Sequence, residues 1–150
     1  MSRQGMIAAK QYAEDLPKFE SLSTAESVLL MAKEQTLGAL LDQYGERLSL
    51  DLSRESLKRL EKWYIESGCP EAGAGSYSMP HAIGFYFGEV LCRFGGFHWV
   101  VEEFPFEPGR YDIGVKRPLL SIMLTKGKRP TLERNKRMQS LWRECGGYAL

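Results

Sequence analysis

One stretch of the chain decides the fold: Pro80-His-Ala-Ile-Gly-Phe-Tyr-Phe-Gly-Glu-Val-Leu-Cys-Arg-Phe-Gly-Gly-Phe-His-Trp-Val-Val-Glu-Glu-Phe104. Large apolar residues surround its first half on almost every side, which predicts a buried helix with a proline in its first turn. The pair Gly95-Gly96 ends this helix, and the residues that follow alternate between two faces as they do in a strand. The stretch therefore predicts a central helix that is joined to a sheet by a glycine turn.

Two amphipathic helices are expected before this stretch. Ser23-Thr-Ala-Glu26 has the spacing of a capping box, which predicts a helix over residues 24–44 that ends at Gly45 in the left-handed conformation. Asp51 or Ser53 is a suitable cap for a second helix that runs to Ser67. We expect residues 1–22 to form a loosely docked N-terminal arm, and residues 68–79 to form a flexible loop.

The sequence after the central helix predicts two more strands and a last helix. The strands are expected at residues 111–115 and 119–125, and Thr131 is a natural cap for the C-terminal helix. An order of helices, then strands, then a helix is typical of an α+β protein. We therefore predict one α+β domain over residues 23–150, in which N-terminal helices and a buried central helix pack on an antiparallel sheet of about three strands.

Composition excludes several classes of protein. A chain of 150 residues that is 43% hydrophobic can bury a core, and its net charge of +1 excludes a strongly charged disordered chain. No apolar run is long enough to span a membrane, and the sequence has neither a signal peptide nor a phosphate loop. The two histidines and the cysteines Cys69, Cys92 and Cys145 lack metal-ligand spacing, so we expect no metal, no cofactor and a cytoplasmic location.

Positive charge gathers near the C-terminus. Residues 1–103 carry a net charge of −5, whereas residues 104–150 carry +6. Within the second part, Glu133 is the only acid among six closely spaced cations, which are Lys126, Lys128, Arg129, Arg134, Lys136 and Arg137. Cations near a helix N-terminus oppose the helix dipole, which favours a role beyond stability. We interpret them as a docking site for an acidic protein, with a solvated helix face and a nucleic-acid contact as alternatives.

Aromatic residues and an arginine are concentrated after the first strand. Phe104, Phe106, Arg110 and Tyr111 lie in a segment that also contains two prolines. Because aromatic residues and arginine are common anchors of protein interfaces, we expect these four residues to contact a partner. The alternative is that the rings fold back under the sheet.

Glu89 interrupts the otherwise apolar central helix. We expect it to form an ion pair with Arg93 four residues later, or to accept hydrogen bonds from a neighbouring helix start. The catalytic alternative joins Glu89 to His98 as an acid–base pair, if the fold brings the helix and the first strand together.

The segment from Phe85 to Trp99 resembles a broad group of small bacterial domains. In this group an aromatic-x-Gly-Glu helix precedes a Gly-Gly turn and a strand tryptophan, and an upstream helix opens with a Ser-Leu pattern like Ser56-Leu57. The resemblance covers about residues 45–125. It implies an α+β fold, and some proteins of this kind are immunity proteins that neutralise a toxin.

These observations favour a non-catalytic protein-binding domain with an acidic protein partner, of the immunity-like kind. A nucleic-acid-associated protein that uses residues 126–143 is the first alternative. An enzyme that uses Glu89 and His98 is the second.

Overall fold

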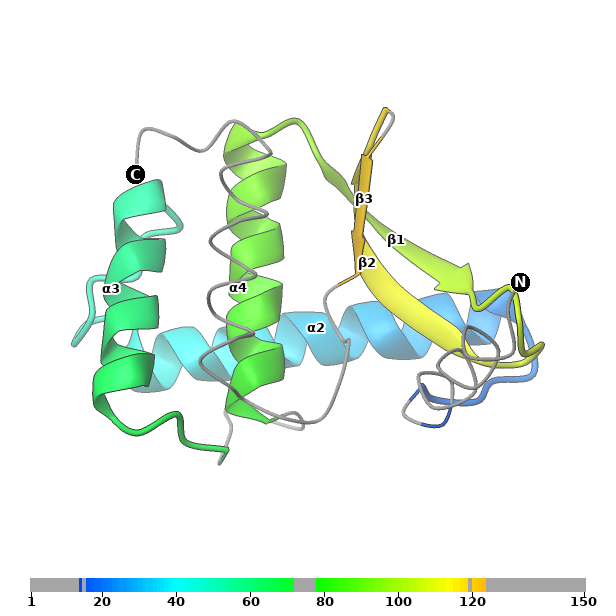
Figure 1. Ribbon diagram of the computed structural model, residues 1–150, viewed down its shortest axis with the longest axis horizontal. Coiled ribbons are helices and arrows are strands. Elements are labelled where there is room, and N and C mark those ends of the chain that lie inside the picture. Colours follow the sequence, from blue (N-terminus) through cyan, green and yellow to red (C-terminus); the bar gives the residue numbers. More distant parts are fainter. Residues whose placement is uncertain (1–13, 15, 72–77, 119, 124–150) are drawn as a thin grey trace, which may run out of the picture.

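The computed structural model describes residues 14, 16–71, 78–118 and 120–123, and within them it contains three helices and a three-stranded antiparallel sheet (Figure 1). In chain order the elements are α2 (Leu22–Tyr44), α3 (Arg54–Glu66), α4 (Met79–Phe94), β1 (His98–Glu103), β2 (Tyr111–Arg117) and β3 (Leu120–Met123). The predicted α+β fold is confirmed. The predicted C-terminal helix and the cations between residues 126 and 143 lie outside the described residues.

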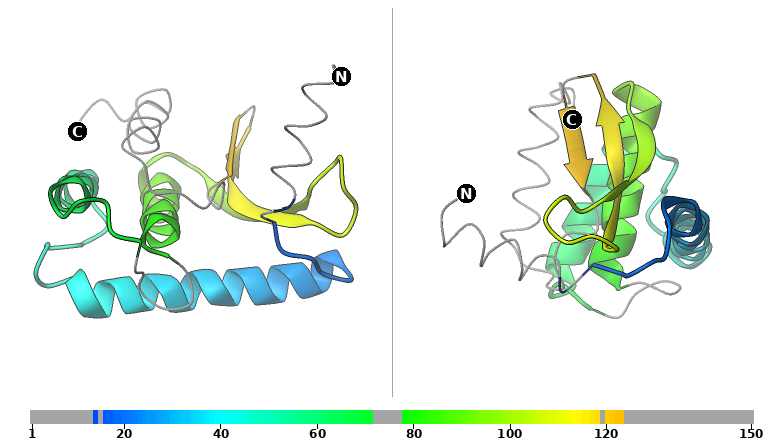
Figure 2. Two further views of the ribbon diagram at one scale, coloured as in Figure 1. Left: turned by 60° about the horizontal axis from the view of Figure 1, so that its bottom comes forward. Right: turned by 90° about the vertical axis from the view of Figure 1, so that its right-hand side faces the viewer.

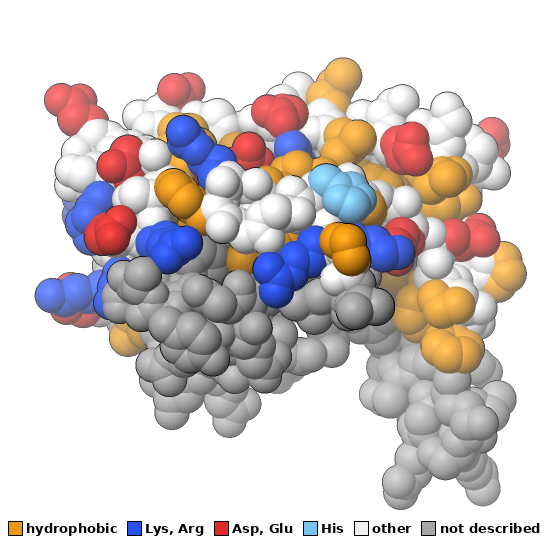
Figure 3. Space-filling model, turned by 90° about the horizontal axis from the view of Figure 1, so that it is seen from above, with side chains coloured by type: hydrophobic (Ala, Val, Ile, Leu, Met, Phe, Trp, Pro, Cys, Tyr) orange, Lys and Arg blue, Asp and Glu red, His pale blue; other side chains and the backbone are white. Residues whose placement is uncertain are grey.

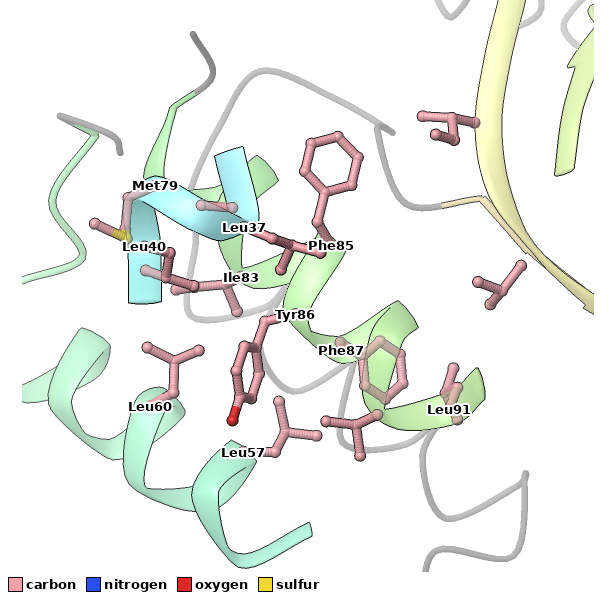
Figure 4. Packing of buried hydrophobic residues seen from close by; sticks show 14 of the residues in the cluster. Leu37, Leu40, Leu57, Leu60, Met79, Ile83, Phe85, Tyr86, Phe87 and Leu91 are labelled. Atoms are coloured by element: carbon pink, nitrogen blue, oxygen red, sulfur yellow. The ribbon is translucent and has the colours of Figure 1, made fainter. Parts of the chain in front are cut away.

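Helix α4 forms the centre of the core, as its sequence predicts. Eleven of its sixteen residues are buried, including Phe85, Tyr86 and Phe87. Leucines from α2 and α3 close in around it, and Figure 4 shows Leu40 and Leu60 beside Ile83 and Tyr86. An all-round apolar helix is stable only when other elements cover it. Helices α2 and α3 and the sheet all contact α4, so this helix fixes the arrangement of the fold.

The sheet stands at one end of the molecule, with strand order β1-β2-β3. Trp99 of β1 pairs with Val115 of β2, and Val101 pairs with Ile113. Residues 111–115 of the central strand β2 are all buried. Helix α2 runs along one side of the whole molecule, past α4 and under the sheet (Figure 2). None of the helices in the described part of the chain is long and apolar enough to cross a membrane.

The two ends of α2 differ from the sequence prediction. The cap is Ser21, whose hydroxyl accepts a hydrogen bond from the Thr24 amide at 3.2 Å, and Ser23 lies inside the first turn. Gly45 is not left-handed, because its φ of −57° continues the helical conformation. The chain reverses further on, where Ser49 and Leu52 have positive φ values.

Helix α3 begins as predicted, with Ser53 as its cap. The Ser53 hydroxyl accepts from the Ser56 amide at 3.1 Å, and Asp51 accepts from the Ser53 amide at 3.1 Å. Hydrogen bonding with Ser53, through its side chain first and its backbone amide second, lowers the pKa of the Asp51 carboxyl. The buried Tyr86 hydroxyl then accepts from the Leu52 amide at 2.8 Å and lies 2.5 Å from the Ser56 hydroxyl, which joins the start of α3 to α4.

The last residues of the predicted N-terminal arm are docked on the β1–β2 connection. The Phe19 amide donates to the Gly109 carbonyl at 2.9 Å, and the Tyr111 amide donates to the Pro17 carbonyl at 3.1 Å. Leu16 is buried. These hydrogen bonds fix residues 16–19 more firmly than the loose arm that the sequence predicts, because their backbone groups pair with those of the hairpin.

Candidate functional site

An exposed phenylalanine beside an arginine marks the end of the molecule where α4 ends and α3 begins. We call this surface the Phe94 edge, and its residues are Arg54, Arg93, Phe94 and Arg117. The Phe94 ring is 48% exposed, and the Arg54 guanidinium carbon lies 5.5 Å from its centroid. The sequence predicts Phe94 as part of the buried helix surface, and the structure corrects this.

The glycine turn after α4 explains why Phe94 faces solvent. The Gly95 amide donates to the Leu91 carbonyl at 2.7 Å, and Gly96 adopts a φ of +72° that suits a residue without a Cβ atom. The turn directs Phe97 into the core. Arg117 of β2 then closes it, because its guanidinium donates to the Gly95 carbonyl at 3.0 Å and stacks 4.9 Å from the Phe97 ring centroid.

Positive charge dominates the Phe94 edge. Figure 3 shows a row of Lys and Arg side chains, with hydrophobic side chains between them, that crosses this end of the molecule. Arg93 is exposed in the last turn of α4, where a cation also complements the helix dipole. A ring among arginines is the composition that protein interfaces favour at their anchors.

Within the described residues, Glu89 pairs neither with Arg93, the partner expected in its own helix, nor with His98, the partner expected for catalysis. Its carboxylate accepts a hydrogen bond from the Trp99 indole at 2.9 Å. Within the described residues no ion pair joins Glu89 to Arg93, which is exposed. His98 is also exposed, and successive strand residues point to opposite faces, so it does not share the direction of Trp99. In the part of the chain that the structure describes, no hydrogen bond joins Glu89 to His98.

Trp99 is the centre of a cluster that joins α2, α4 and β1. The Lys33 ammonium lies 4.6 Å from its ring centroid, and Phe85 packs edge-on at 6.2 Å. The Lys33 side chain is nearly buried, and its ammonium pairs with the exposed Glu34 at 2.6 Å. Glu89 thus satisfies the indole N–H, and the cluster fixes the strand against both helices.

The thiol beside this cluster is unsuited to nucleophilic chemistry. Burial first and the Glu89 charge second raise the pKa of Cys92 to about 11, although the Lys33 charge opposes the rise. At neutral pH the side chain is therefore a thiol, and the thiolate is the reactive form. In the described part of the chain, no group of three His, Cys, Asp or Glu residues could hold a metal ion.

The four predicted anchor residues of the aromatic segment divide into two kinds. Phe106 is 61% exposed, and Phe104 packs edge-on against it at 5.6 Å. Arg110 instead donates to the Leu16 carbonyl at 2.6 Å and pairs with Glu107 at 3.7 Å. Tyr111 is buried against Phe19, and burial followed by the Glu103 charge raises its pKa. Arg110 and Tyr111 therefore hold residues 16–19, and Phe106 is the ring of this segment that faces solvent.

The sequence contains one signal that could have revealed the Phe94 edge. Phe94 is the last residue before Gly95-Gly96, and a helix side chain at this position projects beyond the neighbouring core. Arg54 gives no such signal, because its contact with Phe94 depends on how α3 packs beside α4. The predicted docking residues Lys128, Arg129, Arg134, Lys136 and Arg137 lie outside the described residues.

Comparison with known proteins places the chain in a family. The family model described as uncharacterised protein YwmA matches residues 18–145. The YwmA protein of Bacillus subtilis (strain 168) is 31% identical over 116 residues, which cover 72% of this chain and 73% of that protein. No solved structure matches. The chain therefore belongs to the YwmA family, and its predicted kinship with a group of small bacterial proteins is confirmed at this level.

Proposed function

We propose that this member of the YwmA family is a non-catalytic binding domain that recognises an acidic protein, in the manner of an immunity protein that neutralises a toxin. The Phe94 edge is the contact surface. The observation that carries the proposal is the half-exposed Phe94 ring, with the Arg54 guanidinium 5.5 Å away. The free cysteines Cys69 and Cys92 are compatible with a cytoplasmic location, which we propose as well.

The Phe94 edge combines attraction with a fixed shape. Burying the exposed half of a phenylalanine contributes about 1 kcal/mol, which is roughly half of the value for a complete side chain. Arg93, which is exposed, adds a pairing site for carboxylates. The surface is also preorganised, because Arg117 closes the turn beneath it and α4 is the most buried helix. A fixed surface loses little conformational entropy when a partner binds.

The same geometry supports binding over catalysis. The Glu89 carboxylate accepts a hydrogen bond from the Trp99 indole, and the Cys92 thiol is protonated at neutral pH. A catalytic base must reach the proton that it abstracts, and Glu89 points into a structural cluster.

The test reverses charge on the Phe94 edge. Arg54→Glu with Arg93→Glu changes the net charge by −4, and Lys58→Glu with Lys62→Glu is a matched control on the exposed face of α3. Each tagged protein is incubated with lysate of its host, and the retained proteins are identified by mass spectrometry. We expect an acidic protein that the wild type and the control retain and the edge variant loses.

The identified protein is then titrated directly against all three forms. An affinity that falls at least about tenfold in the edge variant alone supports the proposal, since tenfold corresponds to about 1.4 kcal/mol. Equal retention by all three forms, or retention of nucleic acid alone, contradicts it.

A nucleic-acid contact is the second candidate, and the exposed ring favours it too. Aromatic side chains beside cations stack with bases of single strands. Fluorescence anisotropy with a labelled single-stranded oligonucleotide tests this candidate over a series of salt concentrations. Binding that weakens steeply with salt and is lost in the edge variant supports it, and no binding at low salt removes it.

A further inference from the structure

The outer face of α2 forms a continuous exposed seam. Its residues are Thr24, Val28, Met31, Gln35, Gly38 and Asp42, and all six are exposed. Successive members are four, three, four, three and four residues apart, which is the spacing of a coiled-coil contact line. Met31 is 61% exposed and Val28 is 48% exposed. In Figure 2 the other described elements lie on one side of α2, and the buried residues of this helix occupy the opposite face to the seam.

Within the described residues, nothing in the fold requires a glycine at position 38. It lies inside the helix, where glycine is less favourable than alanine, and no atom lies within 4 Å of the place that a Cβ atom would occupy. Its φ lies in the ordinary helical range, so no left-handed conformation requires it either. A glycine on a helix surface does allow another backbone or a large side chain to approach closely.

The seam is complementary to itself when it is reversed. Residue 33 lies midway along the helix between Thr24 and Asp42, so a twofold axis can be placed beside it. When a second α2 helix is related to the first by this axis, the two helices are antiparallel and Val28 lies opposite Gly38 of the second helix. A branched side chain then faces a position that has no side chain. The same axis places Met31 opposite Gln35. We propose that α2 pairs in antiparallel orientation with α2 of a second copy of this chain, and that the protein is a twofold-symmetric dimer.

Charge favours the same orientation. Asp42 is the one charged residue of the seam, and it lies near the C-terminus of α2, where the helix dipole opposes a negative charge. The first turn of α2 contains no acid, and its N-terminus carries partial positive charge. Antiparallel pairing places Asp42 beside this end of the second helix. Parallel pairing would place the two Asp42 carboxylates together and the two Gly38 positions together.

The composition of the seam favours a second copy of the chain over a strongly charged partner. A partner of strong opposite charge would find one seam carboxylate, Asp42, along a helix that is about 34 Å long. Glu34 lies beside the seam, and the Lys33 ammonium at 2.6 Å offsets its charge. Each large or charged residue of the seam has its complement on the seam itself, which is the requirement for a symmetric interface.

Sedimentation equilibrium of the full chain tests the proposal. The wild type is expected to change from monomer to dimer within about 1–500 μM, the range of a modest interface. Gly38→Leu fills the open position with a good helix former, and we expect it to raise the dimer dissociation constant at least about tenfold. Circular dichroism confirms that the variant keeps its helices. A wild type that stays monomeric throughout, or a dimer that Gly38→Leu leaves unchanged, overturns the proposal.

Asp42→Lys determines the orientation by the sign of its effect. The substitution improves the charge at the end of its own helix, so a weaker dimer cannot result from a damaged fold. Antiparallel pairing predicts a dissociation constant raised about fivefold or more, because lysine then lies beside the N-terminus of the second helix. Parallel pairing only replaces two facing carboxylates with two facing ammonium groups, so an unchanged dissociation constant indicates parallel pairing and overturns the antiparallel arrangement, as does a tighter dimer.

Discussion

Two cation–aromatic pairs in this protein have the same chemistry and different surroundings. Lys33 lies over Trp99 within the fold, and Arg54 lies over Phe94 at the surface. The inner pair is completed by Glu89, which accepts the indole N–H, so its polar groups are satisfied inside the chain. The outer pair leaves about half of Phe94 exposed, beside the half-buried Arg54. A ring that the fold covers contributes to stability, whereas a ring that is exposed is available to a partner.

Removing the inner ring should have the largest effect on stability. Trp99→Ala deletes the contacts with Phe85 and Lys33 and leaves the Glu89 carboxylate without its donor. We expect the free energy of unfolding to fall by about 3 kcal/mol, at the lower end of the range for large aromatic residues because the ring is not fully buried. Urea denaturation followed by circular dichroism measures this change.

Phe94→Ala is the matched substitution at the outer ring. Its expected loss is below about 1 kcal/mol, because half of the ring is already in water. A loss as large as that of Trp99→Ala would show that the outer pair is structural too, and would remove the contrast between the two pairs.

Arg117→Ala should affect both stability and binding. The variant loses the hydrogen bond to the Gly95 carbonyl and the stacking on Phe97. We expect unfolding to become easier by about 1–2 kcal/mol, as for a hydrogen bond to a charged group. Because this turn holds Phe94 in place, affinity for the partner should also fall. Titration at a temperature where the variant is fully folded separates the two effects, and unchanged affinity would show that the turn does not position the ring.

Glu89→Gln probes the charge of the inner cluster while keeping its shape. The amide oxygen can still accept the indole N–H, so stability should change by less than about 1 kcal/mol. The negative charge of Glu89 helps to raise the pKa of Cys92, and its removal should lower that pKa below the wild-type value of about 11. The measurement is the pH dependence of alkylation in a background where Cys69 and Cys145 are serine. An unchanged pKa would mean that burial alone sets it.

The pH dependence of stability tests the raised pKa of Cys92 in the folded protein. The ordinary pKa of a cysteine here is 9.0, and the folded protein raises that of Cys92 to about 11. The unfolded chain therefore loses its thiol proton first, and the contribution of Cys92 is complete below pH 9 and lost as the pH rises to 11. Denaturant midpoints at pH 8 and pH 10.5 should differ less in Cys92→Ala than in the wild type. An equal difference in both would contradict the raised pKa.

The sequence predicts features that depend on local patterns. The run of apolar residues in α4 and the Gly95-Gly96 turn are sufficient to predict the central helix and the strand after it, because burial on all sides and a glycine stop are local properties. The Ser53 cap is predicted for the same reason. The cap of α2 is placed two residues too late, since Ser21 and Ser23 are chemically equivalent candidates.

The candidate site depends on contacts between distant segments, which local patterns do not contain. Glu89 meets Trp99 because β1 folds back beside α4, and Arg54 meets Phe94 because two helix ends coincide. Arg110 resembles a surface anchor in the sequence, yet it holds the carbonyl of Leu16, which is 94 residues away. Charge and aromaticity can be read from the sequence, whereas exposure cannot.

The most direct test of the central claim uses the partner protein that the wild type captures. This protein is titrated separately against the wild type and against the Phe94→Ser variant. The proposal predicts that the affinity falls at least about tenfold, which corresponds to about 1.4 kcal/mol, while the midpoint of urea unfolding stays close to that of the wild type. If the affinity is unchanged in a folded variant, the Phe94 edge is not the contact surface, and the proposed function is wrong in its central part.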